Sequence, residues 1–129
     1  MGKGGTTVQV DEKKINVRQS AVDQAIRYVD EHFRDSDLTL ELLAKQSYLS
    51  KNYFALLFEQ QTGYKFKQYV QKKRIALACE LLRSTNYTVS AILAQCGYRD
   101  SKHFYSIFKK ITGMTPSEYR IVVREKTEK

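Results

Sequence analysis

The side chains that could do chemistry in this chain are mainly cations and hydrogen-bond donors. Its 129 residues have a formal net charge of +8, and that charge is confined to one part of the sequence. Residues 38–129 carry sixteen basic and seven acidic side chains, whereas residues 1–37 carry six and seven. A net charge of +9 beside one of −1 is typical of a chain with a polyanion-binding region. A merely solvated basic surface is the alternative interpretation.

The sequence contains none of the common catalytic or metal-binding patterns. It has no glycine-rich phosphate loop, nucleophile elbow, Cys/His cluster or helically spaced carboxylate pair. His32 and His103 are too far apart for a metal-ligand motif, and we interpret His103 as a half-buried packing residue. Cys79 and Cys96 occupy apolar positions of predicted helices, which favours reduced, buried thiols. We therefore predict no enzyme activity, no cofactor and no metal.

Membrane and export signals are also missing from the sequence. No apolar run approaches the ~18 residues that a membrane-spanning helix needs, and the start of the chain has no apolar signal segment. We expect a cytoplasmic protein that does not bind a membrane, with residues 1–16 forming a linker or tag remnant.

A repeated pattern predicts the elements that carry the donors and cations. In each copy a threonine, at 39 or 88, precedes a short apolar helix, and a turn leads to a longer helix, capped by Ser50 or Asp100. Five residues recur at an offset of fifty: Phe54, Phe58, Thr62, Gly63 and Tyr69 match Phe104, Phe108, Thr112, Gly113 and Tyr119. Two helices joined by a short turn form a helix-turn-helix, so the repeat predicts a duplicated helix-turn-helix unit.

Residues 66–83 connect the two copies. Read as a helix, this stretch has one apolar stripe that includes Leu77 and Leu81 and a second, on the opposite side, that includes Ile75 and Leu82. A surface helix needs only one apolar stripe, so we predict a strut with a subdomain packed on each side. In the longer helix of the second copy, the inward residues are expected to be Phe104, Ile107, Phe108 and Ile111.

These elements predict an all-α, homeodomain-like fold of about seven helices. The expected divisions are residues 17–64 for the first helix-turn-helix subdomain, 65–84 for the connecting helix, 85–125 for the second helix-turn-helix subdomain, and 126–129 for a tail. An amphipathic helix over residues 17–33 opens the first subdomain. The last helix begins at TPSE, residues 115–118, which combines a capping threonine, proline at the first helical position and a glutamate three residues after the cap.

Three stretches of this repeat carry specific motifs. They are LTLELLAKQSYLSKNYFALLFEQQTG, YVQKKRIALACELLRST and AILAQCGYRDSKHFYSIFKKITGMTPSEYR. With these motifs in order, residues 39–120 resemble the double helix-turn-helix DNA-binding domain of AraC/XylS-type transcription regulators. The resemblance implies that each unit lays its longer helix in a major groove, in two adjacent grooves. The strut supports this, because a helix of about 27 Å is close to the ~34 Å between successive major grooves.

In a helix-turn-helix, the first turn of the longer helix and the outward positions one turn later reach base edges. In the first unit these positions are Lys51, Asn52, Ala55 and Leu56, and in the second they are Ser101, Lys102, Tyr105 and Ser106. Asn52 could pair with adenine, Ala55 or Leu56 could contact a thymine methyl, and Lys102 could contact guanine. The family often has a polar residue and an arginine where this chain has Ala55 and Leu56. Leu56 packed on a neighbouring helix is the alternative.

Phosphate contacts are expected from side chains around the two units: Thr39, Lys65, Lys67, Thr88, Lys109 and Lys110. Residues 39–63 have no net charge, whereas residues 88–113 carry +3. We therefore expect the second unit to supply more electrostatic affinity. Arg74 could brace the strut through a buried ion pair or reach a phosphate.

The predicted function is sequence-specific binding of double-stranded DNA for transcriptional regulation by a bacterial-type regulator. Partners implied by the resemblance are RNA polymerase or an upstream sensor or receiver domain, and the isolated domain is expected to be monomeric. A helical protein-protein interaction module is the alternative, but it would explain neither the duplication nor the charge confined to it.

Overall fold

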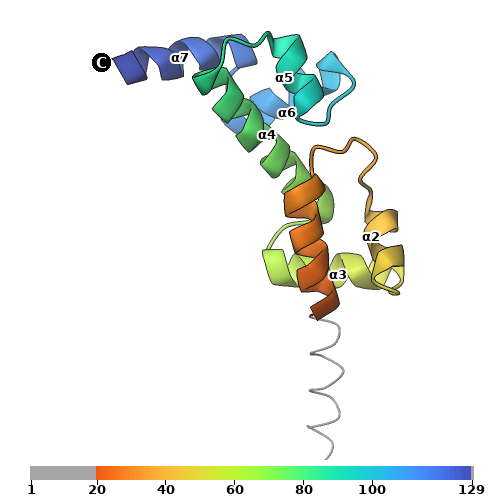
Figure 1. Cartoon of the computed structure of the whole chain (residues 1–129). Coiled ribbons are helices and arrows are strands. Elements are labelled where there is room, and N and C mark those ends of the chain that lie inside the picture. The colour runs from red at the N-terminus through yellow and green to blue at the C-terminus, as the bar shows by residue number, and fades with distance from the viewer. Residues whose placement is uncertain (1–19, 129) are drawn as a thin grey trace, which may run out of the picture. The chain divides into compact units, whose positions relative to one another are not determined.

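The computed structural model describes residues 20–128, and in this range all regular secondary structure is α-helical, as the sequence predicted. A helix over residues 20–32 comes first. The start of this helix was expected at residue 17 and a linker at residues 1–16, and both lie outside the described residues. The helices that follow are α2 (Leu40–Gln46), α3 (Lys51–Thr62), α4 (Phe66–Ser84), α5 (Val89–Gln95), α6 (Ser101–Thr112) and α7 (Pro116–Glu128) (Figure 1). No helix among residues 20–128 combines the length and apolar character needed to cross a bilayer.

The helices form two compact units. In the described range, unit 1 contains residues 20–29 and 39–66, and unit 2 contains residues 30–38 and 67–128. Nearly all of α4 therefore belongs to unit 2, together with the short segment that leaves the first helix. The tail expected at 126–129 is wrong in its extent, because α7 remains helical through Glu128.

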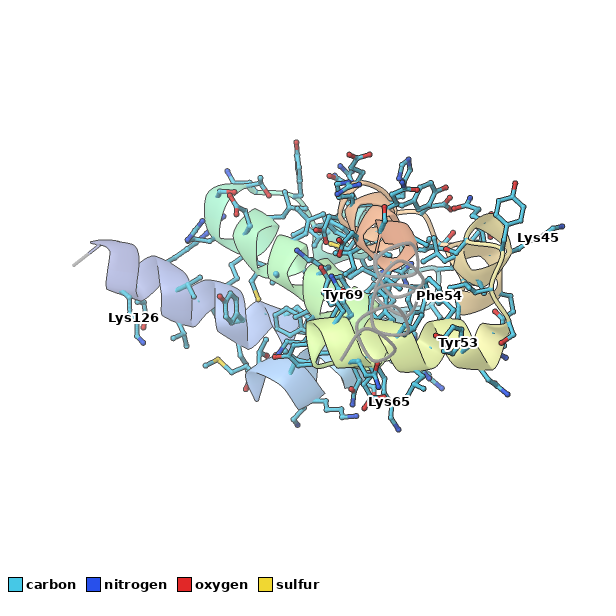
Figure 2. All side chains as sticks on the ribbon, turned by 90° about the horizontal axis from the view of Figure 1, so that it is seen from below. Lys45, Tyr53, Phe54, Lys65, Tyr69 and Lys126 are labelled. Atoms are coloured by element: carbon cyan, nitrogen blue, oxygen red, sulfur yellow. The ribbon has the colours of Figure 1, made fainter. Side chains whose placement is uncertain are left out.

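Unit 1 is built on two phenylalanine rings from α3. Phe54 and Phe58 are fully buried and stack on each other at 6.0 Å between centroids, while Phe66 meets Phe58 edge-on at 5.5 Å. Figure 2 shows Phe54 among the helices of this unit, with Lys45 projecting away from it. The facing side chains that are buried on the first helix and α2 are Val22, Ala25, Val29, Leu43 and Ala44.

Local hydrogen bonds set the helix boundaries of unit 1. Thr39 Oγ1 accepts a bond from Leu42 N at 3.1 Å, and Ser50 Oγ accepts one from Tyr53 N at 3.2 Å, which confirms both predicted caps. Gly63 ends α3 with a φ of 82°. The turn between α2 and α3 contains Tyr48 at a φ of 58°. Tyr48 is 96% exposed, so no neighbouring helix crowds it, although the close approach of its own Cβ and carbonyl oxygen still costs about 1–2 kcal/mol.

Unit 2 has a single core rather than one on each side of the strut. Ile75, Ala78 and Leu82 of α4 are buried in it, and Leu77 and Leu81 border the same core. The prediction that the two apolar stripes are buried in separate subdomains is therefore wrong for the second half of α4, because one core covers both stripes. The rest of the core consists of side chains from α5, α6 and the turn between them: Ile92, Leu93, Cys96, Tyr98, Phe104, Ile107 and Phe108. Ile111 was expected to face inward, but it is 42% exposed and does not belong to this core.

The last helix is fixed at its start and to the end of α4. Thr115 N donates to Glu118 Oε1 at 2.9 Å and Glu118 N donates to Thr115 Oγ1 at 3.2 Å, which confirms the predicted capping box. Arg120 donates to the carbonyl oxygens of Leu82 and Thr85 at 3.1 and 3.2 Å. These carbonyls have no partners within α4, so the arginine satisfies the C-terminal turn of the helix.

The segment after the first helix is bound to unit 2 through its main chain. Arg74 Nε donates to Phe33 O at 2.6 Å and Arg74 Nη2 donates to Asp35 O at 2.9 Å. Its guanidinium carbon also lies 5.4 Å from the ring centroid of Tyr98. Burial lowers the pKa of Arg74 from its usual value. Arg74 is thus a brace, as in the first of the two roles that the sequence left open, but it acts through main-chain carbonyls and not through the expected ion pair.

Candidate nucleic-acid interface

The repeat contains two longer helices, α3 and α6, and the outer face of α6 is the more polar of the two. The inner face buries Phe104, Ile107 and Phe108, each at most 8% exposed. Because these residues fix the rotation of the helix, the four side chains predicted to contact bases face solvent: Ser101, Lys102, Tyr105 and Ser106. This face presents hydroxyl and ammonium donors, which can bind base-edge acceptors.

Cations lie at both ends of this face. Asp100 caps the helix by accepting a bond from Lys102 N at 3.1 Å, and the Lys102 side chain is exposed. Lys109 and Lys110 are exposed in the last turn, where the helix dipole favours positive charge. Arg99, just before the cap, is held by Asp37 at 3.0 Å. No salt bridge joins the α6 lysines to a carboxylate within residues 20–128, so they are well placed to bind an external anion.

The outer face of α3 is less charged and more apolar. Lys51, Asn52 and Leu56 are exposed, and Ala55 is half-buried. Leu56 is 53% exposed, so it lies outside the buried core of unit 1 and keeps about half of its surface accessible. Lys51 Nζ lies 2.7 Å from Glu41 Oε1 of α2. Hydrogen bonding from Lys51 lowers the pKa of the Glu41 carboxyl.

The predicted phosphate contacts are distributed over both units. Thr39 and Thr88 are exposed and accept bonds from Leu42 N and Ala91 N, each at 3.1 Å, which leaves their own hydroxyl hydrogens able to donate. Lys65, before α4, projects from unit 1 in Figure 2. Lys67, in the first turn of α4, is exposed on unit 2.

Two features of this surface were missed or misread from the sequence. The ion pair between Glu41 and Lys51 was not predicted, since it joins residues ten positions apart on different helices. His103 is exposed rather than half-buried, and only its ring contacts the core, with its centroid 5.7 Å from that of Tyr98. The helical register would not have indicated this exposure, because position 103 lies at the border between the outward Lys102 and the buried Phe104.

Two helix-turn-helix units with corresponding outward faces define the chain as a double helix-turn-helix protein. The family described as a helix-turn-helix domain matches residues 43–121. The chain is 34% identical over 106 residues to the regulatory protein PocR of Salmonella typhimurium, covering 82% of this chain and 35% of that protein. The chain therefore belongs to the AraC-type helix-turn-helix family, a family of transcription regulators rather than enzymes.

Solved structures give the same result for the fold. The C-terminal domain of AraT, a response regulator from Geobacillus stearothermophilus, is similar with a TM-score of 0.76 and 35% identity, over 79% of this chain and 84% of that one. The DNA-binding domain of AdpA, solved with a target DNA, has a TM-score of 0.77 and 26% identity over 81% and 94%. The chain spans about a third of the length of the first curated relatives it matches.

Proposed function

We propose that this chain binds double-stranded DNA sequence-specifically to regulate transcription, with α3 and α6 each inserted in one of two adjacent major grooves. The observation that carries this proposal is the outer face of α6, where four donor side chains are exposed opposite three buried apolar ones. The similar domain of AdpA was solved in complex with a target DNA. The nineteen residues of α4 span about 28 Å, close to one ~34 Å turn of DNA.

Base recognition is proposed to differ between the units. In unit 2, Lys102 contacts guanine, and Ser101, Tyr105 and Ser106 provide further donors. In unit 1, Asn52 contacts adenine, while Ala55 and the exposed Leu56 contact thymine methyl groups. Lys51 lies in the first turn of α3, where it is paired with Glu41. These assignments predict a recognition site with an A/T-rich block for unit 1 and a G-containing block for unit 2.

Backbone contacts are proposed for the peripheral cations and hydroxyls: Thr39, Lys65, Lys67, Thr88, Lys109 and Lys110. These groups fix the register of the protein on the duplex without reading sequence. An upstream receiver or sensor domain and RNA polymerase are proposed as further partners of the whole regulator. The response regulator AraT, whose C-terminal domain is similar, supports the first of these.

In vitro selection of duplexes from a random pool tests the proposal directly. We expect two short conserved blocks whose centres are about one helical turn, ~10 bp, apart. A single block would show that one unit reads sequence alone. No enrichment, with binding that does not weaken as salt rises, would instead support the protein-interaction module.

The phosphate contacts of α6 have a separate test. Replacing Lys109 and Lys110 by glutamine should make the slope of log K against log salt shallower by about two units, since each lost phosphate contact removes about 0.9. The matched control replaces Lys45 and Lys126, which removes the same charge from exposed sites elsewhere (Figure 2). Equal slopes for the two double variants would show that only net charge matters.

A further inference from the structure

We infer that Glu41 is a positioning residue that holds Lys51 away from the DNA phosphates, so that α3 contacts DNA through uncharged side chains. The inference rests on the DNA binding proposed above and extends it. By this inference, Glu41 of α2 lowers the electrostatic contribution of α3 to DNA affinity, so that more of this contribution comes from unit 2.

The geometry of the ion pair supports this role. Glu41 lies in the first turn of α2 and Lys51 in the first turn of α3, and their charged atoms are 2.7 Å apart. Lys51 is the one basic residue in the α3 sequence KNYFALLFEQQT. The pair has no net charge, so the carboxylate offsets the charge of the lysine wherever the two stay bonded, and both side chains are exposed at the surface where a phosphate would bind. The other α3 side chains predicted to contact bases are neutral, namely Asn52, Ala55 and Leu56, while the exposed Glu59 lies nearer the far end of the helix.

Unit 2 lacks this arrangement at the corresponding positions. By the internal repeat, Glu41 corresponds to Ser90 and Lys51 to Ser101. No salt bridge joins an α6 lysine to a carboxylate among residues 20–128. One copy of the repeat thus presents free cations on its longer helix, while the other neutralises the single cation it has. This difference follows from a contact between helices and not from the number of lysines alone.

The magnitude of the effect follows from counterion release. A lysine that gains one phosphate contact steepens the salt dependence by about 0.9, so relative to 1 M salt it raises affinity about 15-fold at 50 mM and about fourfold at 200 mM. We expect Glu41→Gln to produce these gains with the full chain, measured by fluorescence anisotropy on a duplex obtained by selection. The gain should be equal on a scrambled duplex, because phosphate contacts carry no sequence information.

Two matched variants separate the ion pair from a simple change in net charge. Glu59→Gln removes the same charge from an exposed position of α3, where no salt bridge to Glu59 is found in the described structure, and it should raise affinity much less. In a Lys51→Gln background, Glu41→Gln should have almost no effect, since the cation it would release is gone. Circular dichroism on each variant checks that the helices are intact.

The possible results are distinct. A gain that depends on Lys51 and is shared by both duplexes supports the inference. An equal gain with and without Lys51, a gain no larger than that of Glu59→Gln, or a gain confined to the selected duplex overturns it, while DNA binding itself stands. A wild-type chain that shows no salt-dependent binding to any duplex overturns both the inference and the proposed function.

Discussion

Replacing Gly97 by alanine tests how the segment after the first helix is bound to unit 2. Gly97 lies in the turn between α5 and α6 at a φ of 98°. An added Cβ would lie 2.8 Å from Arg34 O and 3.0 Å from Arg34 C, both main-chain atoms. Gly113, which ends α6 at a φ of 80°, has no atom within 4 Å of the same added carbon. The two glycines therefore share a left-handed backbone but differ in crowding.

The expected cost of each substitution can be worked out from these differences. Alanine in a left-handed conformation costs about 1–2 kcal/mol, and Gly113→Ala should lose only this. Gly97→Ala must also displace the main chain of residue 34. That movement weakens hydrogen bonds from Arg34 to Gln95 O, at 2.8 Å, and from Arg74 to two carbonyls of the segment. If these three bonds, worth about 1 kcal/mol each, lose two thirds or more of their strength, the total is about 3–5 kcal/mol.

Urea and thermal unfolding of the two variants provide the measurement. Gly97→Ala should be less stable than Gly113→Ala by about 2 kcal/mol or more. Each kcal/mol lowers the melting temperature of a domain of this size by about 4–8 °C, so the two melting temperatures should differ by at least about 8 °C. The two variants could instead lose the same unfolding free energy within about 0.5 kcal/mol, the usual scatter for independent sites. That result would show that the close approach of Gly97 to Arg34 does not contribute to stability, and it would refute the prediction.

Two further predictions concern buried groups of the same unit. Tyr98 is 5% exposed, and among the described residues the neighbouring Arg74 guanidinium interacts with its hydroxyl without a well-formed hydrogen bond, so Tyr98→Phe should change the unfolding free energy by less than about 1 kcal/mol or increase it; a larger loss in urea would show that the interaction with Arg74 is a full hydrogen bond. Burial raises the pKa of the Cys96 thiol to about 12 from its usual 9, so the native state keeps its proton longer than the unfolded state. Stability from this group is therefore constant below pH 9 and falls from pH 9 towards 12, by up to ~1.4 kcal/mol per pH unit. Urea midpoints at pH 8 to 10 should fall more steeply for the wild type than for Cys96→Ala, and equal slopes would contradict the assignment.

The repeat and the helix boundaries could be predicted from the sequence because they depend on neighbouring residues. A capping hydroxyl or carboxylate bonds to an N–H two or three positions later, as at Thr88 and Asp100. A helix ends where glycine adopts a positive φ, as at Gly63 and Gly113. The same local periodicity placed the phenylalanines of α3 and α6 inward. The family likeness followed from these motifs in their order.

The tertiary structure decided which side chains remain available on the outward faces. Lys51 and Lys102 look alike in the sequence, but one is paired with Glu41 and the other is exposed without such a partner. Arg74 became a brace for the segment at 33–35 because the fold brings that main chain to it. Such contacts join residues that are distant in sequence or on separate helices. Their existence depends on how helices pack, which helical periodicity along one segment does not specify.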